Sequence, residues 1–172
     1  MKAFKTLMPW LRLVRLPNLL TVPGDPVAGF LLAATARGEM PHAGRLAAAA
    51  GASLCLYVFG LILNDMVDLA EDARERPDRP LPAGAVTLPQ ARMAAIAMAL
   101  SGLNLALFAG KVPLLLAAAL GGAVIAYNAG LKRLPCAGVM CMGICRGLSL
   151  LLGAATAWPE MFAAPARTNL PV

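Results

Sequence analysis

The sequence predicts an all-α fold, a polytopic transmembrane bundle of about five helices, in a single membrane domain over residues 1–172. Of the 172 residues, 59% are hydrophobic and only 14% are charged, whereas soluble domains are about 25% charged. Apolar runs long enough to cross a bilayer follow one another with short connections. These runs leave almost nothing for a water-soluble domain.

The first predicted span covers residues 16–36, provided that Asp25 is tolerated between Pro23 and Pro26. We expect the two prolines to kink this helix and to free backbone carbonyls. Three further spans are uninterrupted apolar runs and the last contains Arg146; these four cover residues 46–63, 93–110, 112–131 and 134–158.

The two ends of the chain carry weaker signals. The N-terminus begins with basic residues, as a signal peptide does, but Asp25 interrupts the apolar core that such a peptide needs, so we expect a retained first helix. Residues 159–172 contain prolines and no further apolar run. We expect this tail to be disordered.

Basic residues are unevenly distributed between the predicted loops, and they predict the orientation. With the N-terminus inside the cell, ten of them lie on the cytoplasmic side: Lys2, Lys5, Arg12, Arg15, Arg74, Arg76, Arg79, Arg92, Lys132 and Arg133. Four lie outside: Arg37, Arg45, Lys111 and Arg167. We therefore expect a multi-pass protein of the cell membrane with a cytoplasmic N-terminus. The spread of charge over several loops, without interleaved aromatic residues, does not favour a nucleic-acid partner.

The segment after the second span carries six of the nine acidic residues, between Asp65 and Asp78. Asp65, Asp68 and Asp72 are spaced so that a helix would present them on one face, within an arc of about 60°. Asn64 and Asp68 are also neighbours on that face. Mg²⁺ prefers oxygen ligands and commonly combines one or two carboxylates with substrate phosphates. The pattern predicts a Mg²⁺ site at Asn64, Asp65, Asp68 and Asp72.

Basic residues near this face have two interpretations. Arg76, Arg79 and Lys132 are suited to meeting the outer oxygens of a diphosphate. Alternatively, the segment is a solvated acidic cap on a membrane helix, neutralised by Arg74, Arg76 and Arg79.

Residues 64–72 and 79–84 resemble the first aspartate-rich motif of the UbiA-type intramembrane prenyltransferases, N-D-x-x-D-x-x-x-D followed by R-P-L-x-x-G. Residues 13–18 (LVRLPN) are similar to the start of the family's first helix, and Tyr127 with residues 131–133 (LKR) is similar to the end of its fourth. The resemblance is specific over residues 64–87 and weaker elsewhere.

The resemblance implies Mg²⁺-dependent transfer of a prenyl group from a polyprenyl diphosphate to an acceptor, often aromatic and otherwise a lipid or polyol. Metal and cations would neutralise the leaving diphosphate, while an apolar cavity excludes water. We expect Asp68 and Asp72 to be catalytic, and the substrate-binding residues to be Arg76, Arg79, Lys132, Tyr127 and Arg146.

Two features depart from the family's pattern. The gaps from Asp72 to Arg76 and from Arg76 to Arg79 are one residue shorter than usual. A second aspartate-rich motif is absent, because Glu160 is the only acidic residue after Asp78. We therefore expect an incomplete UbiA-like fold from a truncated chain, or one that works with a partner subunit supplying the second motif. The alternative function is a catalytically incomplete membrane protein that binds prenyl lipid or a partner.

A CDP-alcohol phosphotransferase also uses spaced aspartates at a membrane helix. Its pattern requires an Asp-Gly pair, and the sequence contains none. The sequence therefore disfavours this class of enzyme.

Arg146 and Asp25 are charges inside predicted spans. An arginine at mid-helix costs about 2.5–3.5 kcal/mol, so Arg146 should face the protein interior. Counted from the cytoplasmic side at 1.5 Å per residue, Asp25 lies about 14 Å deep and Arg146 about 18 Å deep. The similar depths predict a shared polar cavity, in which the two side chains are either paired or both face substrate. The alternative is that the helix boundaries are misplaced and each charge lies near a membrane interface.

Overall fold

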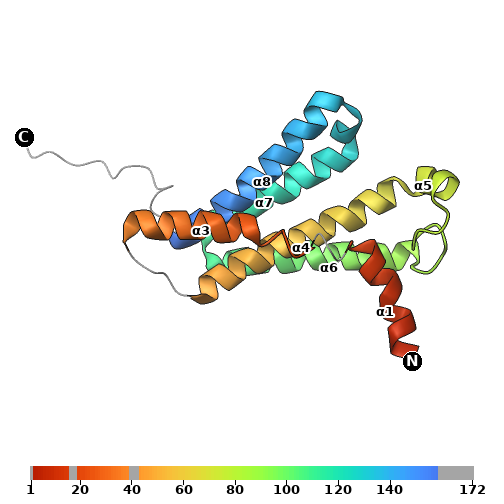
Figure 1. The fold of residues 1–172 in the computed structure, drawn as a ribbon, viewed down its shortest axis with the longest axis horizontal. Helices are drawn as coiled ribbons and strands as arrows, with labels where there is room; N and C mark the ends of the chain where they lie inside the picture. Colours follow the sequence, from red (N-terminus) through yellow and green to blue (C-terminus); the bar gives the residue numbers. More distant parts are fainter. Residues whose placement is uncertain (1, 16–18, 39–42, 159–172) are drawn as a thin grey trace, which may run out of the picture.

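The computed structural model describes residues 2–15, 19–38 and 43–158, and these residues form helices and turns with no strand (Figure 1). The elements are α1 (Lys2–Leu13), α3 (Gly24–Arg37), α4 (Ala43–Val67), α5 (Leu69–Glu75), α6 (Leu88–Ala109), α7 (Lys111–Ala129), the 3₁₀ turn η1 (Leu131–Arg133) and α8 (Pro135–Ala157). The all-α helical bundle predicted from the sequence is confirmed. The expected disorder of residues 159–172 concerns a segment outside the described residues.

Four of the described helices are long and apolar enough to cross a membrane, namely α4, α6, α7 and α8. They coincide with the spans predicted at residues 46–63, 93–110, 112–131 and 134–158. The helices begin and end within a few residues of the apolar runs, because polar or proline-containing segments flank each run.

The span predicted at residues 16–36 is wrong in its first part. Helix α3 begins only at Gly24 and has 14 residues, while α1 ends at Leu13. Pro23 is the N-cap residue of α3 and Pro26 lies in its first turn, where a missing backbone N–H breaks no helical hydrogen bond. The two prolines therefore start the helix instead of kinking it, and Asp25 lies in the first turn of α3.

Helices α4 and α6 run side by side along their length, and the α7–α8 hairpin leans away from them toward the η1 end (Figure 1). All four helices meet in a core of small and branched apolar residues: Ala49, Ala52, Leu56, Ala106, Ala117, Leu120 and Leu152. Small side chains let helix backbones approach closely, which stabilises helix pairs in lipid, where the hydrophobic effect is weak.

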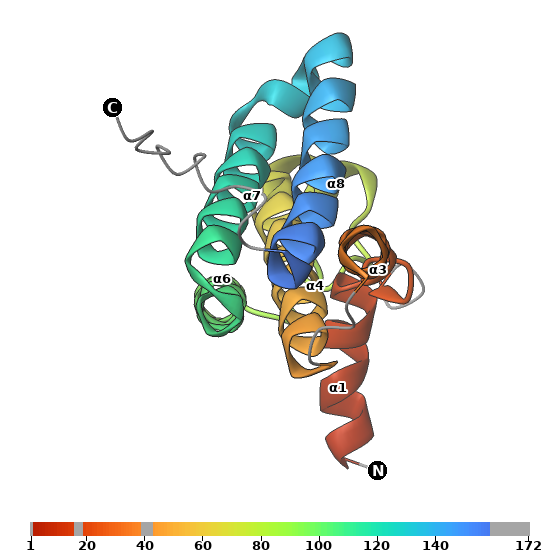
Figure 2. The same cartoon turned by 90° about the vertical axis from the view of Figure 1, so that its left-hand side faces the viewer.

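Helix α3 packs along α8, as both views show (Figures 1 and 2). Two glycines permit this contact: a Cβ on Gly29 would overlap the carbonyl oxygen of Leu150, and a Cβ on Gly153 would overlap that of Pro26. Phe30 is buried in the same interface. The backbones of α3 and α8 are therefore in direct contact, and this contact fixes the first turn of α3 relative to α8.

The segment between α5 and α6 is a folded loop. Helix α5 ends as Arg76 precedes Pro77, because a residue before proline is disfavoured in the helical conformation. Within the loop the Ala83 N–H donates to the Arg79 carbonyl oxygen over 2.9 Å, and the Val86 side chain is buried. These contacts hold Arg79 in place beneath the end of α4.

Candidate active site

The acidic motif lies where α4 ends and α5 begins. Asp68 separates the two helices, yet the backbone hydrogen bonds continue through it: the Asp68 N–H donates to the Asn64 carbonyl oxygen over 2.9 Å, and the Asp72 N–H to that of Asp68 over 2.8 Å. The helical spacing of the motif is therefore maintained across the junction.

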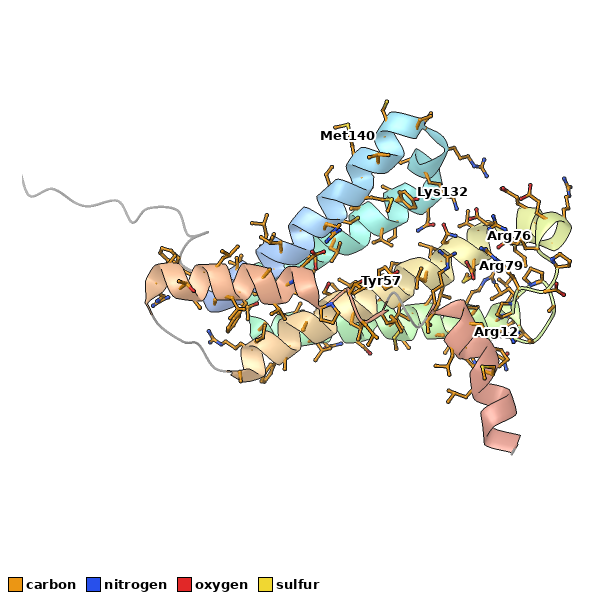
Figure 3. The ribbon with its side chains drawn as sticks, in the orientation of Figure 1. Arg12, Tyr57, Arg76, Arg79, Lys132 and Met140 are labelled. Atoms are coloured by element: carbon orange, nitrogen blue, oxygen red, sulfur yellow. The ribbon has the colours of Figure 1, made fainter. Side chains whose placement is uncertain are left out.

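Lys132 reaches two oxygens of the motif. Its ammonium nitrogen Nζ lies 3.1 Å from Asn64 Oδ1 and 2.5 Å from Asp68 Oδ1. Figure 3 places Lys132 at the η1 end of the α7–α8 hairpin, across from Arg76 and Arg79 at the α5 end of α4. One cation therefore connects the hairpin to the end of α4.

Arg79 pairs with the other two carboxylates of the motif, which are buried. Its Nη1 lies 2.5 Å from Asp72 Oδ2 and 3.6 Å from Asp65 Oδ1, and Arg15 Nη2 lies 3.5 Å from the same Asp65 oxygen. Asp65 and Asp72 are only 6% and 5% exposed. Asp65 Oδ1 is buried without a hydrogen bond from any described residue. The motif is thus divided between an arginine-paired, buried half and a lysine-paired, more open half.

The predicted metal ligands are Asn64, Asp65, Asp68 and Asp72. No group of three or more His, Cys, Asp or Glu side chains within the described ranges is arranged to hold a metal ion, because Asp68 faces Lys132 while Asp72 faces Arg79. The donor types nevertheless fit Mg²⁺: an amide oxygen and a carboxylate already share one cation, and Mg²⁺ takes its other ligands from phosphates and water. Metal binding therefore stays a prediction.

A cavity of about 690 Å³ lies among α3, α4, α7 and α8. One face of α4 lines it throughout, through Ser53, Leu56, Tyr57, Gly60, Leu61 and Asn64. From Ser53 to Asn64 this face extends about 16 Å at 1.5 Å per residue. The cavity therefore runs from the Lys132-paired Asn64, past an apolar middle, to a second polar end.

Asp25 and Arg146 meet at that second end. Arg146 Nε donates to Asp25 Oδ2 over 3.1 Å, and Nη2 donates to Oδ1 over 2.8 Å. Beside them the hydroxyls of Ser53 and Ser149 share a buried hydrogen bond of 2.7 Å. Of the two arrangements left open by the sequence, the structure has the paired one.

The other residues predicted to bind substrate occupy two environments. Tyr127 is half-buried and lines the cavity, as Arg146 does. Arg76 is exposed where α5 ends and is not among the residues that line the cavity. A role in substrate binding stays a prediction for each of them.

Sequence reasoning missed several residues of the cavity. Tyr57 and Ser53 are spaced seven and eleven residues before Asn64, so the helical period that grouped the aspartates would also have found them. Arg15 lies in the LVRLPN segment at residues 13–18, which was its signal in the sequence; its φ of 50°, uncommon for a residue other than glycine, is seen only in the structure. Asn128 gave none: its Oδ1 is buried by tertiary packing without a hydrogen bond from the described residues.

Comparison with known proteins agrees with this geometry. The chain is 35% identical over 101 residues to digeranylgeranylglyceryl phosphate synthase of Methanoculleus marisnigri, a match that covers 59% of the chain and 36% of that relative. It is 32% identical over 153 residues to the synthase of the same name from Ignicoccus hospitalis, covering 89% of the chain and 48% of that relative. The chain thus spans about half the length of these relatives or less.

A solved structure described as giving insights into digeranylgeranylglyceryl phosphate synthase in membranes has the same fold. It superposes with a TM-score of 0.80 at 23% sequence identity, over 88% of this chain and 53% of that one. The sequence model of the UbiA prenyltransferase family matches residues 26–166, which include the acidic motif, Lys132 and the cavity face of α4. This multi-pass membrane chain therefore belongs to the UbiA prenyltransferase family.

Proposed function

We propose that the chain binds the diphosphate group of a polyprenyl diphosphate at the Lys132 end of the cavity and serves Mg²⁺-dependent transfer of the prenyl group to an acceptor. The observation that carries the proposal is the Lys132 ammonium bound to Asn64 and Asp68, because Asn64 also lines the cavity. The name of the relatives supports a glyceryl phosphate lipid as acceptor over an aromatic one.

In the proposed reaction the bond between the allylic carbon and the diphosphate oxygen breaks, the hydroxyl oxygen of the acceptor bonds to that carbon, and the released diphosphate takes up the hydroxyl proton. Mg²⁺, when bound through Asn64 and Asp68, would compensate charge on the departing diphosphate. Lys132 donates to the outer phosphate oxygens and supplies positive charge where negative charge develops. Arg79 keeps the adjacent carboxylates Asp65 and Asp72 paired.

The cavity beyond Asn64 suits the prenyl chain. Its middle is lined by apolar side chains such as Leu56 and Leu61, which bury a hydrocarbon chain and exclude water from the reacting carbon. Tyr57 and Tyr127 line the same space. Aromatic faces attract positive charge, so both rings would favour the carbocation-like centre that forms as the diphosphate departs.

Binding of geranylgeranyl diphosphate tests the proposal. The radiolabelled compound should bind the purified protein in nanodiscs in a Mg²⁺-dependent manner, and Lys132→Gln should weaken binding by about tenfold or more, the usual effect of losing a charge-assisted hydrogen bond. Lys111→Gln is the matched control, because Lys111 is an exposed lysine at the opposite end of α7. Equal affinities in the two variants would refute the site.

A second candidate function is binding of prenyl lipid without catalysis, alone or with a partner subunit. Within the 172 residues one aspartate-rich motif is present, and Glu160 is the one acidic residue after Asp78. The two candidates differ in turnover. Under the second, the 172-residue chain binds geranylgeranyl diphosphate but transfers no prenyl group to prenylglyceryl phosphate, whereas Mg²⁺-dependent transfer by the chain itself would exclude it.

A further inference from the structure

The Asp25–Arg146 pair leaves half of the Arg146 guanidinium without a partner among the described residues. A guanidinium has two edges that can each grip an oxyanion with two N–H groups. Asp25 occupies the edge formed by Nε and Nη2. The other edge consists of Nη1 and the second hydrogen of Nη2, and it makes no hydrogen bond within the described part of the chain. The Arg146 side chain is 77% exposed, against 25% for Asp25.

The surroundings of this edge indicate what it faces. Arg146, Asp25, Ser53 and Ser149 all line the cavity whose other end holds Asn64. The Ser53–Ser149 pair lies about 16 Å from Asn64 along α4, and Arg146 precedes Ser149 by three residues, about one turn, on α8. A hydrocarbon chain placed here would remove these polar groups from water and offer no hydrogen bond to the open edge of Arg146, which is unfavourable. The far end of the cavity therefore suits a polar group on a second ligand.

The pair is not required to hold α3 on α8. The backbones of these helices are already in contact through Gly29 and Gly153, and Phe30 is buried between them. A salt bridge with an exposed arginine adds little stability in any case. The pair is better explained by the orientation that Asp25 imposes on Arg146.

We propose that Arg146 forms a second subsite of the cavity, which binds the oxyanion of an anionic amphiphile, a phosphate or a carboxylate, through its Nη1–Nη2 edge. Asp25 is a positioning residue that holds the opposite edge, and the Ser53–Ser149 pair lies beside the bound group. The inference rests on the proposed function, because this second ligand would be the acceptor of the prenyl group.

Binding of simple amphiphiles tests the subsite without requiring catalysis. Radiolabelled decyl phosphate, decanoate and decanol are titrated into the purified protein in nanodiscs of neutral lipid. One or both anions should bind more tightly than decanol, and the tighter anion identifies the preferred group. Arg146→Gln should weaken anion binding by about tenfold or more and leave decanol binding unchanged. Arg92→Gln, an exposed arginine on α6, is the matched control.

Two further variants separate the subsite from a structural role. Arg146→Lys keeps the charge but loses the two-pronged edge, so anion affinity should fall between wild type and Arg146→Gln. Asp25→Asn should weaken anion binding less than Arg146→Gln, because it only loosens the arginine. Melting temperatures are measured for each, and if Arg146→Gln fails to fold, the Arg146→Lys and Asp25→Asn affinities decide.

The diphosphate site provides an internal comparison. Lys132→Gln should leave the Arg146-dependent binding of decyl phosphate unchanged, while Arg146→Gln should leave the Lys132-dependent binding of geranylgeranyl diphosphate unchanged. If decyl phosphate binds Arg146→Gln and Arg92→Gln equally, the subsite is refuted while the diphosphate site stands. If Lys132→Gln instead binds geranylgeranyl diphosphate as tightly as wild type, while Arg146→Gln still weakens decyl phosphate binding, the proposed function is refuted.

Discussion

Lys132, in the turn after α7, donates its ammonium hydrogen to Asp68, which lies 64 residues earlier between α4 and α5. The same nitrogen also reaches Asn64. The contact connects the α7–α8 hairpin to the acidic motif at the end of the cavity (Figure 3). Charge-assisted contacts of this kind are stronger than neutral hydrogen bonds, so substitutions around them should have measurable effects.

Asp68→Asn should reduce Mg²⁺-dependent binding of geranylgeranyl diphosphate by about tenfold or more, since a neutral amide loses both the charge that Mg²⁺ prefers and the ion pair with Lys132. Equilibrium binding with and without Mg²⁺ measures the effect. Glu71→Gln removes an equal charge from an exposed position on α5 and should bind like wild type. A similar loss in both variants would indicate a general effect of acidity and would contradict a specific role of Asp68.

Arg79→Gln should destabilise the protein by about 3–5 kcal/mol, the usual cost of leaving buried charges without their partner. Asp65 and Asp72 are both nearly inaccessible, and Arg79 is the cation that reaches both. Thermal unfolding in detergent checks the prediction. The neighbouring Arg76→Gln alters an exposed arginine and should leave the melting temperature nearly unchanged, so equal shifts in the two variants would show that the buried pairing contributes little.

Gly153→Ala should separate α3 from α8, because a Cβ at this position would overlap the backbone of Pro26. We expect a loss of several degrees in melting temperature and, since Asp25 lies next to Pro26, a shift of Asp25 away from Arg146. A cysteine pair at Ala34 and Ala154, which lie in one buried cluster, would report the separation through its cross-linking rate. Gly143→Ala adds a methyl group to the same helix where no atom lies within 4 Å and should change neither property.

The bias of basic residues predicts that the acidic motif faces the cytoplasm. Ala73 lies on α5 beside the motif and is exposed, so an Ala73→Cys variant offers an accessible thiol there. A membrane-impermeant maleimide should fail to label it in intact cells and should label it after permeabilisation. Labelling from outside intact cells would reverse the orientation.

The sequence was sufficient to identify the four long helices and the acidic motif, because apolar length and helical spacing are local properties. It could not assign the partners of the motif. The three basic residues expected to meet a diphosphate were equivalent in sequence, yet Lys132 binds the open half, Arg79 binds the buried half and Arg76 is exposed. These differences arise from the packing of a distant hairpin and a folded loop, which no local pattern encodes.

The Asp25–Arg146 pair was anticipated for a reason that was only partly correct. The depth of Asp25 was counted along a continuous helix from residue 16, whereas Asp25 lies in the first turn of α3. Arg146 lines the cavity, but its side chain is 77% exposed, so the expected position inside the protein was only partly correct. The cost of a charge in a membrane span does not depend on where the helix begins. It therefore predicted a partner for Arg146 even though the predicted start of the first helix was wrong.

The contact of Lys132 with Asp68 also has a thermodynamic consequence. Two of the three ammonium hydrogens of Lys132 have oxygen acceptors in the protein, so a phosphate that takes more than one of these hydrogens must displace a contact within the protein. Ligand binding through two hydrogens is therefore an exchange reaction, in which a contact within the protein is replaced by one with the ligand. The measured affinity reports the difference between the two contacts, so a variant with a weaker internal contact, such as Asn64→Ala, would bind an anion in the absence of metal more tightly than the native chain.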